Sequence, residues 1–311
     1  MDYIWIIFES NIIYLYLYWL TATAMIRRNQ LIIHISKLII IMARIKQNNQ
    51  YTGTIGGLSH YTRKGSNEIF VRRKGGATKE QIKRRPEFEN TRRNNKEFGG
   101  CSKMSKAIRM AFIGMHHVAD YNLAPALCSL MKNIQRADTE GAWGERSILL
   151  SKYKQYLVGF NFNRITRFDS VLRIPLDYKI DRENTTAILT IPEFACSMGL
   201  SMYEKHRLFR ISACLGVVTD MVLGERKYDY EPVHDTIGLG RRIVSTEWFP
   251  ITGTVNVQTL DINLDLTHPE IIFNTSDTLV LTVAVEFGAY DDFGKPVEVK
   301  GAGAGKVLGV G

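Results

Sequence analysis

The chain has only four cysteines among its 311 residues, and none is placed as a disulfide framework or a zinc finger would require. No CxxC pair is present, and no cysteine has a histidine partner at finger spacing. Cys128 and Cys196 also lie among apolar neighbours. We therefore expect the four cysteines (Cys101, Cys128, Cys196 and Cys214) to be buried, reduced thiols, as is typical of a cytoplasmic protein.

Motifs of the common catalytic, metal and cofactor sites are missing as well. The sequence contains no HExxH pattern, no GxSxG turn and no EF-hand loop. Residues 301–307 are similar to a phosphate loop, but a valine follows Lys306 where Ser or Thr is required. Adjacent histidines on a helix point about 100° apart, so His116 and His117 are not expected to bind one metal ion. We assign no catalytic residue, metal ligand, cofactor or small-molecule ligand.

The first 41 residues have two interpretations. Residues 3–26 are long and apolar enough to span a bilayer, and Arg27 and Arg28 follow as a positive cytoplasmic flank. An inner-membrane anchor with the C-terminal part in the cytoplasm is therefore one interpretation. The other, which we favour, is a misassigned upstream segment over 1–41, because its Ile, Tyr, Leu and Asn content is typical of AT-rich untranslated sequence. The protein would then start at Met42.

The positive charge of the chain is concentrated in one segment. Residues 42–110 contain 17 Lys and Arg against 5 Asp and Glu, a net charge of +12, whereas the whole chain carries +9. A mildly acidic C-terminal part therefore follows a strongly basic segment, which indicates a polyanionic partner. The alternative is a solvated basic face that packs against an acidic protein or against the acidic part of the same chain.

A β-hairpin with basic edges is predicted within this segment. Two runs rich in β-branched and aromatic residues, 58–63 and 69–74, are separated by a polar turn. The basic side chains here and just beyond suit phosphates, and the rings of Tyr61 and Phe70 suit bases. Contacts to phosphates carry no base information, so we expect little sequence selectivity. The predicted nucleic-acid-binding residues are Tyr61, Arg63, Lys64, Arg72, Arg73, Lys74, Lys83, Arg84, Arg85, Arg92 and Arg93.

Helices are predicted after the hairpin. We expect one over 78–86 and a second over 87–98, which Gly99–Gly100 would end. Apolar residues then recur every three or four positions up to Gly141, which predicts two further amphipathic helices that pair as a hairpin and cover a core. Trp143 is expected to pack where these helices meet a sheet. The two apolar stripes are Met104, Ile108, Ala111, Phe112, Met115 and Leu123, Leu127, Leu130, Met131, Ile134.

From Val158 onward the hydrophobic period changes from 3.6 to 2, which predicts strands. A hairpin is expected over 172–191, and the remaining runs bring the number of antiparallel strands to about seven. These runs are 208–223, 252–257, 260–266, 279–287 and 296–300. Residues 306–310 are expected to return to the sheet as an extended edge strand. The predicted fold class is α+β: a basic N-terminal hairpin and helices followed by an antiparallel β-sandwich, immunoglobulin-like or jelly-roll-like. The expected domains are 42–100 (basic region), 101–157 (helical region) and 158–311 (β-sandwich).

The layout of these segments resembles a loosely defined group of bacterial proteins. In that group a basic N-terminus rich in Gly, Arg and Lys precedes helices and a β-rich C-terminal half. The resemblance covers residues 42–311 and supports Met42 as the start, but it implies no activity. The segments that carry it are 42–46, 56–65, 71–74 and 88–94, with 159–163 and 285–288 compatible.

Three hypotheses of function follow from the sequence. The first is a non-enzymatic cytoplasmic binding protein whose basic N-terminal region engages a polyanion, nucleic acid before an acidic protein. The alternative is a self-assembling structural or scaffold protein, a homo-oligomer built on the β-sandwich. The third is a hydrolase whose active-site residues assemble on loops from distant positions. A membrane is expected as a partner only if residues 3–26 form a true anchor.

Overall fold

The computed structural model describes residues 43–46, 50–63, 68–201, 206–225, 229–234, 240–264 and 273–311. The chain divides into two compact units, 1–79 and 80–311. It mixes helices with several sheets; every strand pair in the described ranges is antiparallel, and none of these sheets is closed. No helix within those ranges has the length and apolar character needed to cross a membrane. The membrane segment predicted over 3–26 lies outside the described residues.

The first unit contains a four-stranded sheet in the order β1-β2-β3-β4. The predicted hairpin is confirmed, because β3 and β4 pair with Tyr61 opposite Phe70. Strands β1 and β2 were not predicted. Gly56 and Gly57 have φ angles of +56° and +81°, which fits the tight two-residue turns that join antiparallel strands, here β2 and β3. The strands are β1 (Ala43–Lys46), β2 (Gln50–Ile55), β3 (Leu58–Thr62) and β4 (Ile69–Arg73).

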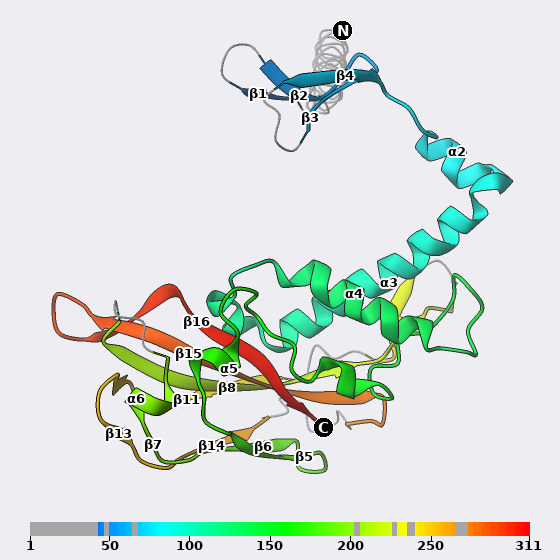
Figure 1. Ribbon diagram of the computed structural model, residues 1–311. Helices are drawn as coiled ribbons and strands as arrows, with labels where there is room; N and C mark the ends of the chain where they lie inside the picture. Colours follow the sequence, from blue (N-terminus) through cyan, green and yellow to red (C-terminus); the bar gives the residue numbers. More distant parts are fainter. Residues whose placement is uncertain are drawn as a thin grey trace, which may run out of the picture. The chain divides into compact units, whose positions relative to one another are not determined.

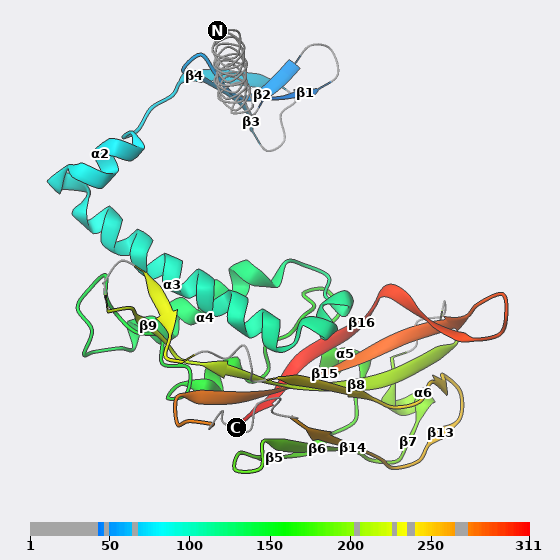
Figure 2. The same ribbon diagram turned by 180° about the vertical axis from the view of Figure 1, so that it is seen from behind.

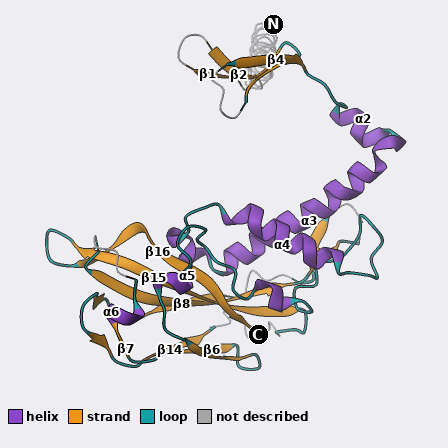
Figure 3. Ribbon diagram, in the orientation of Figure 1, coloured by secondary structure: helices purple, strands orange, loops and turns teal. Residues whose placement is uncertain are grey.

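The second unit is built in three layers (Figures 1 and 3). A central sheet has the order β11-β8-β15-β16, and β12 also pairs with β8. Helices α3 and α4 cover one face of this sheet, and the sheet β14-β6-β5 covers the other. The central strands are β8 (Leu208–Thr219), β11 (Arg241–Ser245), β12 (Phe249–Pro250), β15 (Asp277–Tyr290) and β16 (Pro296–Val310). The smaller sheet is β5 (Asp177–Asp181), β6 (Thr186–Ile191) and β14 (Gln258–Asn263).

Short elements connect the layers. Two further strand pairs, β9 with β10 and β7 with β13, lie outside the larger sheets. These strands are β7 (Phe194–Ala195), β9 (Met221–Leu223), β10 (Tyr230–Pro232) and β13 (Thr254–Val255). The short helices are η1 (Pro86–Phe88), η2 (Ile113–Val118), η3 (Lys154–Leu157), α5 (Phe168–Val171) and α6 (Cys196–Gly199).

The strands β8 and β15 are buried on both faces, which explains their apolar composition. Alternate residues of β8, such as Phe209, Ile211 and Leu215, enter an inter-sheet core shared with the smaller sheet. Cys214 and Val218 point the other way, into a helix–sheet core shared with α3 and α4. Because side chains alternate between the faces of a strand, a run with apolar residues at nearly every position suits a middle layer.

The helix predicted to end at Gly99–Gly100 continues instead through both glycines. Helix α2 (Lys79–Arg84) stops before Pro86, as expected, and α3 then runs over Glu89–Ala111 as one helix. A Cβ atom on Gly100 would lie 2.6 Å from the ring of Tyr230. This glycine therefore permits close packing inside the helix and does not end it.

The helical hairpin is confirmed. Helix α4 (Leu123–Arg136) packs against α3, and their apolar stripes form the helix–sheet core. Asn122 caps α4, since its side chain accepts a hydrogen bond of 3.0 Å from the Ala124 amide. The helix ends at Arg136, before the predicted stop at Gly141.

The C-terminal segment is one long strand where two short ones were predicted. Strand β16 pairs with β15 along both the 296–300 run and the glycine-rich 301–310 run. Gly303 has a φ of +151°, and a Cβ there would lie 2.4 Å from the Val285 carbonyl oxygen. The glycines thus allow close backbone packing in a strand, and the edge strand predicted over 306–310 is confirmed as its end. The predicted 172–191 hairpin is confirmed for β5 and β6, although β5 begins only at Asp177 because Pro175 interrupts the pattern.

A buried carboxylate joins the two long helices to the loop that follows them. Glu97 on α3 is fully buried, and Arg146 donates to its two oxygens at 2.7 and 2.8 Å. Lys132 on α4 and the backbone amide of Gly144 also donate to it. Burial alone would raise the pKa of Glu97, but these donors lower it from 4.5 to about 2.

We expect Glu97→Gln to lower the free energy of unfolding by about 3 kcal/mol at neutral pH. The Glu97 pKa is depressed in the folded state, so its contribution is complete above pH 4.5 and is lost as the pH falls toward 2. Urea unfolding between pH 2 and 7 measures both effects. Glu89→Gln is the control, since Glu89 is half exposed and should contribute less than about 1 kcal/mol. Equal losses of unfolding free energy in Glu97→Gln and Glu89→Gln would contradict the stabilising role of buried Glu97.

Candidate functional site

One face of the first unit's sheet carries a row of alternating arginine and aromatic side chains. The Arg72 guanidinium lies 5.3 Å from the Tyr61 ring centre, and the Arg63 guanidinium lies 4.4 Å from that of Phe70. The two rings are neighbours across β3 and β4, with centres 5.9 Å apart. Both arginines are exposed and both rings are half-buried. We call these four residues the aromatic–arginine row.

The opposite face of the same sheet has a different character. Arg73 lies opposite Leu58, one residue along the strand from Arg72, so it belongs to this second face. His60 is buried there and packs against Tyr51, with ring centres 4.4 Å apart. The predicted residues Arg72 and Arg73 are therefore separated onto two faces, and Arg72 is the one in the aromatic–arginine row.

The other predicted basic residues are distributed over both units. Lys74 follows β4, and its backbone amide donates to the Gly57 carbonyl at 2.7 Å. Lys64 lies outside the described residues. The remaining five belong to the second unit, on α2 and on α3 or between them: Lys83, Arg84, Arg85, Arg92 and Arg93.

Arg92 has a structural role that the sequence did not show. Its guanidinium donates to the carbonyl oxygens of Ile82 at 2.7 Å and Arg85 at 2.8 Å. These carbonyls come at the end of α2, where helical hydrogen bonds are missing. Arg92 therefore fixes the corner between α2 and α3, which leaves fewer of its donors for a phosphate.

Arg93 contributes to a hollow of about 660 Å³ beside α3 that contains Trp143. The Arg93 guanidinium lies 5.7 Å from the Trp143 ring centre, and the Trp143 indole donates to Asn94 at 3.2 Å. Trp143 is 43% exposed, so it does not pack between helices and sheet as predicted. It is an aromatic side chain beside cationic ones that sequence spacing did not identify, because 50 residues separate it from Arg93. Glu89 and Glu145 offset part of the positive charge there.

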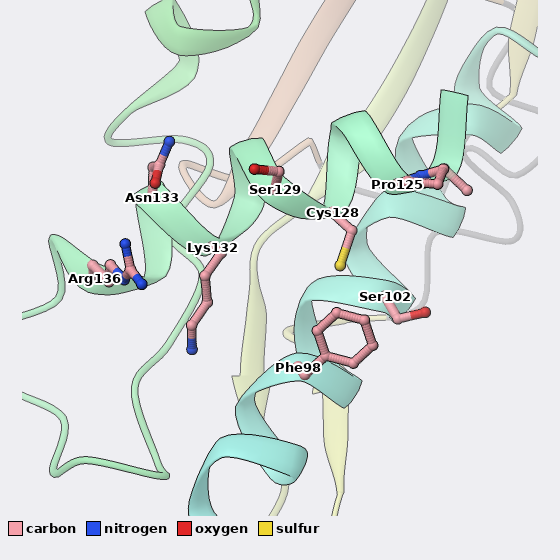
Figure 4. A pocket seen from close by; sticks show the side chains of 9 residues that line it. Phe98, Ser102, Pro125, Cys128, Ser129, Lys132, Asn133 and Arg136 are labelled. Atoms are coloured by element: carbon pink, nitrogen blue, oxygen red, sulfur yellow. The ribbon is translucent and has the colours of Figure 1, made fainter. Parts of the chain in front are cut away.

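A second hollow of about 510 Å³ lies between α3 and α4 (Figure 4). Phe98 projects into it from α3 and is 62% exposed, and Cys128 faces it from α4. Lys132 and Arg136 stand on the α4 side. Burial raises the pKa of the Cys128 thiol, so this cysteine is poorly suited to act as a nucleophile. The hollow combines an apolar floor with a basic edge.

Three side chains of the second unit form a cluster with metal-ligand chemistry. His117 on η2, Glu286 on β15 and Glu298 on β16 bring their ligand atoms within 4.8 Å of one another. In the sequence, the nearby candidate ligands for His117 are His116 and Asp120. His116 instead packs edge-on against Phe112, at 5.4 Å between ring centres. The glutamates could not be identified by spacing, since both lie more than 160 residues further along the chain.

Comparisons with protein-family models, with curated proteins and with solved structures find no match to this chain.

We expect Arg92→Ala to destabilise α2 locally by about 1–3 kcal/mol, because the Ile82 carbonyl loses its donor and the Arg85 carbonyl keeps only the Phe88 amide. Hydrogen exchange of the helix-bonded amides over 83–85 should accelerate roughly 5- to 150-fold, while α4 amides keep their rates. Lys83→Ala, an exposed change on α2 itself, is the matched control and should leave exchange nearly unchanged. Unchanged protection in Arg92→Ala would show that its two hydrogen bonds do not stabilise the corner.

Proposed function

We propose that the protein binds nucleic acid through the aromatic–arginine row of its first unit, and that it prefers single strands to duplexes. The observation that carries this proposal is the alternation of two exposed arginines with two adjacent rings on one sheet face. Proteins that bind single strands combine such stacking surfaces with cationic groups that follow the backbone.

Each part of the row has a chemical counterpart in an unpaired strand. The rings of Tyr61 and Phe70 offer their partly exposed surfaces to bases, which a single strand presents and a duplex keeps stacked. Arg63 and Arg72, at the two ends of the pair, supply positive charge for phosphates. The nearby basic residues Arg73 and Lys74 add electrostatic attraction for phosphates that does not depend on the orientation of the strand. The expected selectivity for base sequence is low, because stacking accepts every base.

We also propose that the chain is divided into three regions with different roles. The basic region 42–100 binds, the helices of 101–157 cover a sheet, and 158–311 forms a β-sandwich of immunoglobulin or jelly-roll type. In support, the central and smaller sheets share the inter-sheet core. A cytoplasmic location agrees with the four cysteines, which are buried and free of disulfides. An acidic protein is the alternative partner for the same basic surface.

The first test measures binding of the full chain to fluorescent single-stranded oligonucleotides across a salt series. Affinity should fall with salt at a log–log slope of about −0.7 for each phosphate neutralised. Tyr61→Ala should weaken binding by about 5- to 150-fold, and Tyr61→Phe should retain it, because the ring is kept.

Arg72→Ala and Arg73→Ala form a matched pair, since each removes one charge from neighbouring positions on opposite faces of β4. Arg72→Ala should cost more affinity than Arg73→Ala, because only Arg72 belongs to the row. Equal losses would indicate general electrostatic attraction without the row. No binding at low salt would refute the proposed function.

The alternative function is self-assembly, and one observation favours it. The tip of the β15–β16 hairpin projects from the central sheet (Figure 2). Three apolar side chains at this tip are exposed. Phe293 is 88% exposed, and Tyr290 and Val297 beside it are about half exposed. Clustered apolar side chains at a projecting tip are typical of a contact surface, and here we propose a second copy of this chain as the partner.

We expect sedimentation of the full chain to show a concentration-dependent increase in mass if the tip joins copies. Phe293→Asp should abolish that increase without changing the unfolding temperature, because the side chain is exposed. Ile165→Asp changes another strongly exposed apolar residue away from the hairpin and is the control. A monomer at high protein concentration would exclude the assembly function.

A further inference from the structure

We propose that His117, Glu286 and Glu298 form a binding site for a divalent transition-metal ion such as Zn²⁺. These side chains come from η2, β15 and β16 of the second unit, so the fold assembles the site from three separate elements. The proposal is independent of nucleic-acid binding, which involves the first unit.

The spacing of the three ligand atoms suits one small cation. Nε2 of His117 lies 3.5 Å from Oε1 of Glu286 and 3.4 Å from Oε1 of Glu298. These separations exceed the usual length of a hydrogen bond, and His117 Nε2 has no hydrogen-bond partner although the atom is buried. A tetrahedral ion about 2.1 Å from each ligand would separate the ligand atoms by about 3.4 Å.

The second atom of each ligand is already fixed by another group. Nδ1 of His117 lies 2.8 Å from the Gly114 carbonyl oxygen and donates to it, so Nε2 is the ring nitrogen that faces the glutamates. Arg210 bonds Oε2 of Glu286 and lies 3.5 Å from Oε2 of Glu298. Metal-binding histidines and carboxylates are commonly oriented in this way by outer partners.

The arrangement also has an unfavourable electrostatic feature that a cation relieves. Two carboxylates meet beside one ring nitrogen of His117, and Glu286 is only 2% exposed. Arg210 supplies one positive charge for two glutamates, and a divalent ion at Oε1 supplies the remainder.

The ligand chemistry indicates the class of ion. One imidazole nitrogen and two carboxylate oxygens suit Zn²⁺, Mn²⁺ or Fe²⁺ better than Ca²⁺, which prefers six or more oxygens. His117 and Glu298 are each about a quarter to a third exposed, so a fourth position is open to water or a ligand. Open positions distinguish catalytic zinc sites from closed structural ones.

The test is Zn²⁺ titration of the full chain against a chromophoric chelator, in the absence of nucleic acid. The wild type should bind one ion per chain, and His117→Gln and Glu298→Gln should each weaken binding about 100-fold or more. His116→Gln is the matched control, because it removes the adjacent histidine that faces Phe112, and it should bind as the wild type does.

Unfolding temperature and circular dichroism without metal show whether each variant folds. Co²⁺ gives a second readout, since three protein ligands in a tetrahedral site should produce intense visible absorption that His117→Gln loses. The proposal is overturned if the wild type takes up no Zn²⁺, because Arg210 and a proton on His117 then satisfy the glutamates. Equal binding by the wild type and folded His117→Gln would overturn it too.

Discussion

The pairing of β8 with β15 is the contact on which the second unit depends. The two strands pair over twelve residues from Leu208 to Thr219, and their side chains enter both cores. Neither the helices nor the smaller sheet could bury an apolar face without them, because each covers only one side of this pair. The packing of the second unit also requires α3 to lie very close to β8. A Cβ on Gly216 would lie 2.2 Å from the Ala111 carbonyl oxygen, so α3 reaches the sheet only over a glycine.

The pairing of β8 with β15 also places charged side chains at the edge of the buried apolar region. Arg210 lies directly opposite Glu286, and the Arg210 guanidinium packs 4.6 Å from the Trp248 ring centre. Glu97 and Glu286 are thus two buried carboxylates, each held by cations from other elements. Glu97 is surrounded by donors on all its oxygens, which suits a structural role. Glu286 instead shares its arginine with Glu298 and faces a ring nitrogen of His117, which suits a ligand.

The first unit follows a different rule, because its sheet is small and rich in charge. Its two faces are distinguished by side-chain alternation: Tyr61 and Phe70 meet on one face, and Tyr51 and His60 meet on the other. Arginines next to rings retain their charge while covering apolar surface. A polyanion that approaches this unit therefore finds two chemically different surfaces.

Local elements whose signals are contained within a few residues could be predicted from the amino-acid sequence. The β3–β4 hairpin, the stop of α2 before Pro86 and the apolar stripes of α3 and α4 were predicted from period and turn chemistry. Local rules failed where a distant group decided the outcome. Gly99 and Gly100 were predicted to end a helix, but Tyr230 packs against Gly100 within the helix. The strand that alternation predicted from 172 was too long for a different, local reason, because Pro175 interrupts it.

Which side chains meet depends on the folded arrangement of the chain. Arg72 and Arg73 are equivalent as charges in the sequence, yet the pleat places them on opposite faces. Arg92, predicted as a phosphate contact, also donates to two carbonyls at the turn between α2 and α3, which no local pattern indicated. His117 acquires its glutamates through the register of β15 and β16. Composition fixes which charges and rings are present, whereas contacts between residues far apart in the chain depend on packing that no local pattern encodes.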